Sequence, residues 1–298
     1  MGAFALSEPE AGSDASNQKT TASRDGNRYV INGTKNFITS GSHADIVIVI
    51  AATDQSKGSH GISAFIVEKG YPGFTVARKE KKMGIRSSDT VSLSFQDCAV
   101  PEKNRIGEEG YGFKFAMKVL EGGRIGIAAQ ALGIAQASLS ASIAYAKQRK
   151  AFGKYISEFQ GIQFKIADMA MKIDAARLMI YKAAYLKDTD KSYGQMSAMA
   201  KLFASKTAVD AALEAIQIHG GYGYLQEYNV ERFLRDAKIT EIYEGTSEVQ
   251  RIVISRYLLK RLSRSNSSFF KSNPPNRKLP PPPGENGQNQ LNFIVFFS

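Results

Sequence analysis

The chain has 298 residues, of which 43% are hydrophobic and 22% charged, as is typical of globular proteins with one or two domains. Its single cysteine, Cys98, excludes an internal disulfide framework and, with only three histidines, argues against a protein-built zinc site. The sequence contains no run of eighteen apolar residues, so no membrane-spanning segment is predicted. The net charge is +11 without a nucleic-acid motif, so phosphate-bearing small molecules are the expected partners.

The first hundred residues have the pattern of a β-domain. Asp25-Gly26 and Asn32-Gly33 are hairpin signals. The runs that predict strands are "RYVIN" (28–32), "KNFIT" (35–39), "DIVIVIAA" (45–52), "GISAFIVE" (61–68), "GFTVA" (73–77) and "VSLSF" (91–95). Because no helical pattern separates these runs, they predict an antiparallel barrel or sandwich.

After Pro101 the apolar residues recur every three or four positions, which predicts helices. Three long helices are expected over 113–149, 158–188 and 195–220, and a fourth from about Thr246 to Lys260. Ser247 and Gln250 have capping-box spacing at the start of the fourth helix. Short loops between such helices predict an up-down four-helix bundle and an α+β chain of more than one domain.

Small residues form a face on the first of these helices. They are Gly123, Gly126, Ala128, Ala129 and Gly133. Close packing against a neighbouring helix explains such a face better than direct ligand contact.

The predicted organisation is a β-barrel domain over 1–105, a helical bundle over 106–260 and a tail over 261–298. The tail holds six of the nine prolines and is rich in Ser and Asn. Such a composition cannot bury enough apolar surface to order itself, so we expect the tail to be disordered.

Glu244, in "IYEGTSEVQ" (242–250), is the candidate catalytic residue. Considered alone, this stretch favours a solvated carboxylate just before a helix. The alternative is a proton acceptor at the mouth of an apolar pocket, because Ile242 and Tyr243 precede it. These apolar neighbours would disfavour the charged form, whereas the N-terminus of the helix would favour it.

Three other stretches have both a structural and a functional interpretation. "FALSEPEAGSD" (4–14) is either a surface loop or a loop that brings backbone N–H groups and hydroxyls against a ring or phosphate. "IHGGYGY" (218–224) holds more glycines than a helix C-cap needs. "KQRKAFG" (147–153) places basic residues at a helix end, where they either pair with the helix dipole or contact a diphosphate.

Six ordered stretches together resemble the acyl-CoA dehydrogenase family from about residue 2 to residue 260, and its short-chain and short/branched-chain members most. They are "FALSEPEAGSD", "NGTKNFIT", "EGGRIGIAAQALGIAQ", "QRKAFGK", "QIHGGYGYLQEY" and "RDAKITEIYEGTSEVQR". The resemblance implies an oligomeric flavoprotein, a tetramer by comparison with the family. It would bind FAD, oxidise an acyl-CoA to the trans-2-enoyl thioester, and pass electrons to an electron-transfer flavoprotein.

The resemblance assigns the proton-abstracting base to Glu244 and gives Gly245 a place beside the thioester. Some family members carry the base on the first bundle helix instead. This chain has Gly123 at that position, and because glycine carries no carboxylate, the alternative arrangement is not expected here. Substrate contacts are implied for Ser13, Glu121, Arg124 and Gly245.

Cofactor contacts are implied in five segments, some of them reaching the FAD of a neighbouring subunit. These residues are Phe4, Leu6, Ser7, Gly12, Ser13, Phe37, Ile38, Thr39, Arg149, Phe152, Gln160, Gln217, Gly220, Gly221, Thr246 and Glu248. The family often has tryptophan where Phe37 stands, and this chain has no tryptophan.

Family members begin with a helical domain of roughly a hundred residues, whereas this chain starts within the β-domain. The competing hypothesis is therefore an inactive fragment that associates as a helical module, and an oxidase that uses oxygen is a weaker third possibility. The resemblance implies the mitochondrial matrix for a eukaryotic protein and the cytoplasm for a bacterial one.

Overall fold

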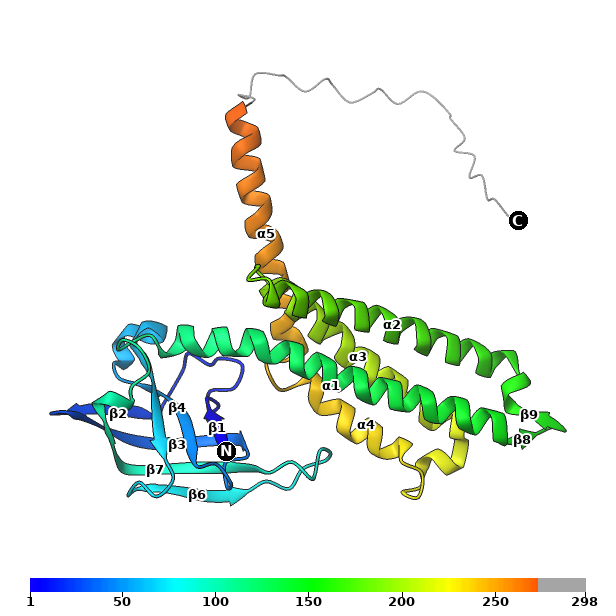
Figure 1. Ribbon diagram of the computed structural model, residues 1–298, viewed down its shortest axis with the longest axis horizontal. Coiled ribbons are helices and arrows are strands. Elements are labelled where there is room, and N and C mark those ends of the chain that lie inside the picture. The colour runs from blue at the N-terminus through cyan, green and yellow to red at the C-terminus, as the bar shows by residue number, and fades with distance from the viewer. Residues whose placement is uncertain (273–298) are drawn as a thin grey trace, which may run out of the picture. The chain divides into compact units, whose positions relative to one another are not determined.

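A computed structural model describes residues 1–272 and confirms the α+β fold class: a curled β-sheet precedes a helical region (Figure 1). The seven strands of the sheet are β1 (Gly2–Ala5), β2 (Thr21–Asp25), β3 (Arg28–Thr39), β4 (Ile46–Ala52), β5 (Ile62–Glu68), β6 (Phe74–Lys79) and β7 (Thr90–Pro101). Their order is β1-β4-β2-β3-β7-β6, and β5 also pairs with β4. Most pairs are antiparallel, as expected, but β1 and β2 each pair with β4 in parallel.

Asp25-Gly26 turns the chain between β2 and β3 as predicted, whereas the hairpin prediction at Asn32-Gly33 is wrong. Residues 28–39 form one strand, β3, with a register shift against β7 between Ile31 and Gly33. Gly33 has φ 147°, and an added Cβ would lie 2.5 Å from Thr20 Oγ1. The glycine therefore serves a bulge and a close backbone approach rather than a turn.

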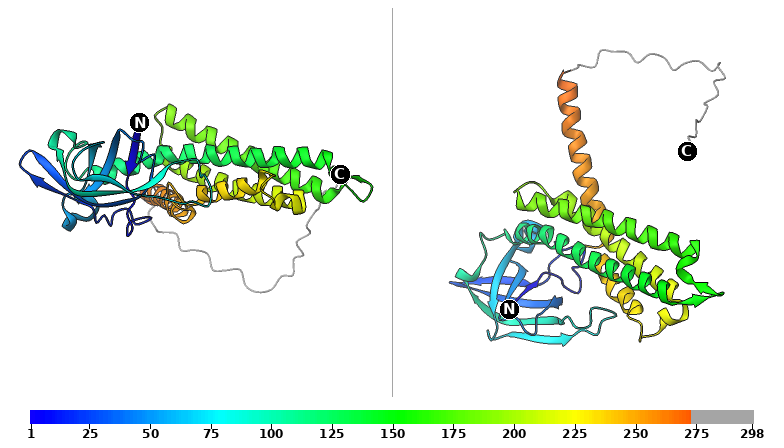
Figure 2. Two further views of the ribbon diagram at one scale, coloured as in Figure 1. Left: turned by 90° about the horizontal axis from the view of Figure 1, so that it is seen from below. Right: turned by 45° about the vertical axis from the view of Figure 1, so that its right-hand side comes forward.

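The helical region contains five α-helices among the described residues. They are α1 (Gly112–Gln148), α2 (Gln160–Asp188), α3 (Gly194–His219), α4 (Val230–Lys238) and α5 (Ser247–Ser272). A short hairpin of β8 (Lys150–Ala151) and β9 (Lys154–Tyr155) joins α1 to α2. The three long helices run side by side in both views of Figure 2, which agrees with the predicted bundle.

Two predictions about these helices need correction. α4 was not expected, because its nine residues are too short for a clear periodic pattern. α5 does not end near Lys260 but continues to Ser272, since residues 261–272 contain neither proline nor glycine. Residues 261–272 of the predicted tail lie in α5, and the remainder of the predicted tail lies outside the described residues.

Alanines make the seam of the bundle. Ala128, Ala131 and Ala135 of α1 and Ala204 and Ala208 of α3 are fully buried in one core cluster. The glycine-alanine face predicted on α1 is not a single face, because Gly126, Ala129 and Gly133 are exposed while Ala128 is buried. By length and composition α1 could cross a membrane, but it is the central helix of this core, so we interpret it as a packing helix.

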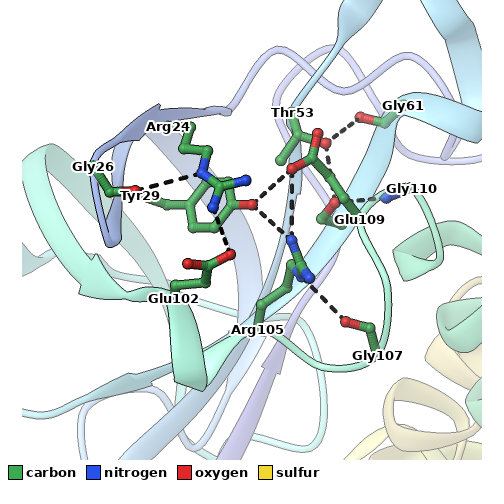
Figure 3. A network of polar contacts seen from close by, with 11 residues as sticks. Arg24, Gly26, Tyr29, Thr53, Gly61, Glu102, Arg105, Gly107, Glu109 and Gly110 are labelled. Carbon is green, nitrogen blue, oxygen red and sulfur yellow. Dashed lines mark hydrogen bonds and ion pairs between the residues drawn. The ribbon is translucent and has the colours of Figure 1, made fainter.

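A polar network ties the sheet to the segment that leads into α1 (Figure 3). The buried Tyr29 hydroxyl donates to Glu109 Oε2 at 2.7 Å and accepts from Arg105 Nη1 at 2.7 Å. The Gly110 amide donates to Ser63 Oγ at 2.9 Å. These bonds set where α1 begins relative to the sheet, and residues 1–257 form one compact unit.

Candidate active site

Glu244 lies in the turn between a 3₁₀ turn (Ile239–Glu241) and α5, and the backbone of this turn is unusual. Glu244 has φ 55° and Gly245 φ 88°, both in the left-handed region that side chains other than glycine rarely adopt. An added Cβ on Gly245 would lie 2.7 Å from Gln250 Nε2. Position 245 therefore needs glycine both for its backbone conformation and for this contact.

The Glu244 carboxylate faces α1 at Gly123. Its Oε2 atom is buried and has no hydrogen-bond partner among the described residues. Contrary to the sequence argument, Ile242 does not provide its apolar surroundings, since that side chain is 49% exposed. Tyr243 is half-buried, and its hydroxyl donates to Gln130 Oε1. The burial of the carboxylate thus comes from packing against the glycine of α1.

Burial raises the pKa of Glu244 above its ordinary value, and the nearby positive charges of Arg124 and Lys201 oppose the rise. In the described part of the chain no backbone amide donates to the carboxylate, so the α5 N-terminus does not bind it directly. A partly desolvated carboxylate flanked by two cations is suited to accept a proton from a carbon acid.

The start of α5 differs from the predicted capping box. Thr246 Oγ1 accepts from the Val249 amide at 3.3 Å, so the cap is one residue earlier than Ser247. Gln250 instead directs Nε2 to the carbonyls of Glu244 and Gly245, at 3.1 and 2.7 Å. The side chain therefore holds the turn that carries the candidate base.

Sequence reasoning missed Lys201 of α3, which is 0% exposed and donates to the Gly245 carbonyl at 2.9 Å. The available signal was a lysine on a face otherwise made of Ala and Ser, with Ala198 and Ala204 three positions away on either side. Glu121 and Arg124, predicted to line the substrate site, lie one turn apart on α1 beside this cluster. Arg124 is 6% exposed, and its Nε has no partner among the described residues.

The loop after β1, predicted to contact flavin, is anchored by a buried ion pair. Lys35 Nζ donates to Glu8 Oε1 at 2.6 Å and to the Leu6 carbonyl at 3.2 Å. The other oxygen of Glu8 accepts from the Lys19 amide at 2.6 Å. Leu6 is buried, Phe4 and Ser7 are half-buried, and Gly12 and Ser13 are exposed at the tip.

The second predicted flavin segment, Phe37–Thr39, lies beside this loop, because the Asn36 amide donates to the Ser7 carbonyl at 2.8 Å. Phe37 has φ 60° and is 67% exposed, whereas the Ile38 side chain is buried in the sheet core. Ile38 can therefore contact a ligand only through its backbone, while Phe37 offers a free aromatic ring.

Six further predicted cofactor residues lie at the other end of α1, about 55 Å along a helix of 37 residues. Arg149, Gly220 and Gly221 line a cavity of about 380 Å³, and Cβ atoms added to both glycines would meet nothing within 4 Å. Phe152 in the β8–β9 hairpin is 95% exposed. Gln160 and Gln217 are exposed nearby on the ends of α2 and α3.

Thr246 and Glu248 line a separate groove of about 620 Å³, whose floor includes Met179, Leu202 and Phe203. The Glu244 side chain does not line this groove, because it turns toward α1. The predicted residues thus fall into three groups: the flavin loop with Phe37–Thr39, the Glu244 cluster, and the distal end of α1. In the described residues no hydrogen bond or ion pair links the first group to the third.

The chain thus combines a curled sheet, a region of long helices and a desolvated glutamate packed against α1, an α+β arrangement with a candidate proton acceptor. Residues 3–98 match the family description "Acyl-CoA dehydrogenase, middle domain", and residues 110–259 match "Acyl-CoA dehydrogenase, C-terminal domain". The chain therefore belongs to the acyl-CoA dehydrogenase family of FAD-dependent oxidoreductases.

Short-chain acyl-CoA dehydrogenases are similar to this chain over 87% of its length. A short-chain specific acyl-CoA dehydrogenase of Megasphaera elsdenii is 57% identical, and the match covers 68% of that relative. The mitochondrial short-chain specific enzyme of Mus musculus is 54% identical, with 63% of its length covered.

Solved structures show the same likeness. The butyryl-CoA dehydrogenase of Megasphaera elsdenii has a TM-score of 0.86 at 56% identity, with 87% of this chain and 68% of that chain covered. A chain in a structure described for the electron transferring flavoprotein of Acidaminococcus fermentans gives the same values.

Proposed function

We propose that this chain dehydrogenates a short-chain acyl-CoA to the trans-2-enoyl-CoA, with Glu244 as the base that removes the α-proton. The observation that carries the proposal is the buried Oε2 atom of Glu244, which has no hydrogen-bond partner among the described residues; the charges of Arg124 and Lys201 favour its ionised form. The short-chain substrate is supported by the specificity of relatives at 54–57% identity, which are short-chain specific acyl-CoA dehydrogenases.

The described residues fit FAD in two places. Phe37 presents an exposed aromatic ring beside the anchored loop at Ser7, which suits a flavin ring. The cavity at Arg149, Gly220 and Gly221 combines a guanidinium with bare backbone, which suits a diphosphate. When bound, FAD supplies the acceptor for the hydride that leaves the substrate β-carbon.

The chain's own contribution is proton transfer and electrostatic positioning. Oε2 of Glu244 receives the α-proton, and the electron pair of that C–H bond enters the new double bond. The positive charge of the buried Arg124 favours the ionised carboxylate, and the glycine at 123 leaves room for it. Exclusion of water by the substrate would raise the basicity of the carboxylate at the moment of transfer.

Two further parts of the proposal concern partners. Because Arg149 and the flavin loop are separated by the length of α1, we infer that Arg149, Phe152, Gln160 and Gln217 serve the FAD of a neighbouring copy in a homo-oligomer, with four copies as the expected number. Electrons would pass to an electron-transfer flavoprotein, in the mitochondrial matrix of a eukaryote or the cytoplasm of a bacterium.

The test is flavin bleaching by butyryl-CoA without an electron acceptor. The FAD-loaded chain should bleach, and the Glu244→Gln variant should bind substrate but bleach about 10²- to 10⁴-fold more slowly. Bleaching by the variant within tenfold of the parent rate would remove Glu244 from this role. A parent chain that retains no flavin absorbance would favour the inactive helical module, and peroxide formation would favour an oxidase.

A further inference from the structure

Lys201 is a lysine buried completely within the helical region. Its side chain is 0% exposed on the face of α3 that also buries Ser197, Ala204 and Ala208. Burial of an ammonium is costly unless hydrogen bonds or opposite charges compensate. Among the described residues Lys201 forms no ion pair within 4.0 Å, and its hydrogen bond goes to the Gly245 carbonyl at 2.9 Å. A lysine buried at this cost points to a role beyond packing.

The turn that Lys201 holds is the one that carries Glu244. Two successive left-handed residues, Glu244 and Gly245, reverse the chain just before α5. Their carbonyls are held from two directions, by Gln250 Nε2 from α5 and by Lys201 Nζ from α3. Such a conformation persists only when the surrounding structure over-determines it. Lys201 is the part of that support that also carries charge.

The charges around the carboxylate come from every element packed against the turn. The groups concerned are Glu121 and Arg124 of α1, Lys201 of α3, Glu241 and Tyr243 before the turn, and Glu248 and Tyr257 of α5. Arg124 and Lys201 are the cations that favour the ionised form of Glu244 against its burial. Burial in turn lowers the pKa of Lys201 to about 8.

We propose that Lys201 is a positioning residue for the base: its ammonium fixes the Gly245 carbonyl and its charge keeps the Glu244 carboxylate ionised before substrate arrives. This inference rests on the proposed role of Glu244. It separates two functions of one side chain, a hydrogen bond that holds the turn and a charge that sets the proton affinity of the carboxylate.

Two substitutions distinguish these functions on the full 298-residue chain. Lys201→Gln keeps a donor but removes the charge, and Lys201→Met removes both. Lys182→Met, an exposed lysine on α2, controls for the loss of a positive charge in general. Glutamate labelled with ¹³C at Cδ reports the Glu244 carboxyl, and the resonance is assigned by its absence from Glu244→Gln.

Both Lys201 variants should raise the pKa of the Glu244 carboxyl by about one unit or more, since a nearby opposite charge lowers a carboxyl pKa by that amount. Lys201→Met alone should also speed amide hydrogen exchange of the peptide 243–250 by about tenfold, the equivalent of one hydrogen bond. The acid limb of flavin reduction should move to higher pH in both variants. Lys182→Met should change none of these.

A titration of the unsubstituted protein gives a test that needs no variant to fold. As Lys201 loses its proton near pH 8, the Glu244 carboxyl resonance should show a second inflection. Absence of that inflection, or an unchanged Glu244 titration in Lys201→Gln, overturns the inference. If Glu244→Gln still bleaches the flavin at the parent rate, the proposed function fails instead, and the carboxyl titration still reports whether Lys201 acts on Glu244.

Discussion

Gly123 and Glu244 share one volume: a Cβ built on Gly123 would lie 2.6 Å from Oε2 of Glu244. The sequence comparison placed a family base at one position or the other, and the structure supplies the physical reason. A side chain on α1 at position 123 would occupy the space that the carboxylate now fills, so the two positions exclude each other.

Gly123→Ala should therefore move the carboxylate while leaving the fold intact. The colliding atom is the end of a flexible side chain, and alanine favours a helix over glycine by about 1 kcal/mol. We expect flavin reduction by butyryl-CoA to slow by about 10²-fold, the cost of a misplacement of about 1 Å.

The matched control is Gly126→Ala on the same helix, where an added Cβ meets nothing within 4 Å. It should gain stability and keep the parent rate. Equal rates for the two alanine variants would contradict the shared-volume explanation.

Glu244→Gln should increase stability more at neutral pH than in acid. Burial raises the pKa of Glu244 in the folded state, so its contribution to stability is complete below the unfolded value of 4.5 and is lost as pH rises through the folded pKa. Glutamine does not ionise, so the stability difference between variant and parent should grow in urea titrations as the pH rises above 4.5 and through the raised folded-state pKa of Glu244. A stability difference that does not change with pH for Glu244→Gln would refute the raised pKa.

Lys35→Met should destabilise the β-domain by about 3–5 kcal/mol, because it leaves the carboxylate of Glu8 buried without its cation. The double variant Lys35→Met/Glu8→Gln should lose less than Lys35→Met alone, since glutamine still accepts from the Lys19 amide without a charge. Arg28→Met, which breaks the exposed pair with Asp25, should change stability little in the same chemical denaturation. A double variant less stable than the single one would show that the pair is not coupled as described.

Arg149→Ala should weaken FAD retention by tenfold or more, about the loss of one hydrogen bond to a charged group. The guanidinium lies 5.5 Å from the Tyr222 ring centroid and borders the cavity at Gly220 and Gly221. Flavin absorbance after gel filtration measures the retained cofactor. Lys147→Ala, exposed on the last turn of α1, is the control, and identical retention in both would remove Arg149 from the cofactor site.

Much of the fold could be predicted because hydrophobic periodicity and turn residues determine strands and helices within short segments of the chain. Four of the predicted strand runs, at residues 45–52, 61–68, 73–77 and 91–95, correspond to β4, β5, β6 and β7. The three long helices also lie close to their predicted ranges. Errors arose where a local signal served a long-range contact, as at Asn32-Gly33, where Thr20 packs against the glycine. The short helix α4 was missed because it is stabilised by contacts with distant parts of the chain. One such contact is Asp236 Oδ1, which accepts from the Ile85 amide at 2.6 Å.

The sequence by itself determined the family, the fold class and Glu244 as the candidate base, since hydrophobic periodicity and the order of motifs can be read from the sequence alone. Only the tertiary structure decided what surrounds that carboxylate. It turned Ile242 outward, placed Gly123 against Oε2 and brought Lys201 beneath Gly245 from 44 residues away in the chain. The physical reason is that the proton affinity of a carboxyl depends on burial and on charges nearby in space, and the helices that supply both here, α1 and α3, are distant from Glu244 in sequence.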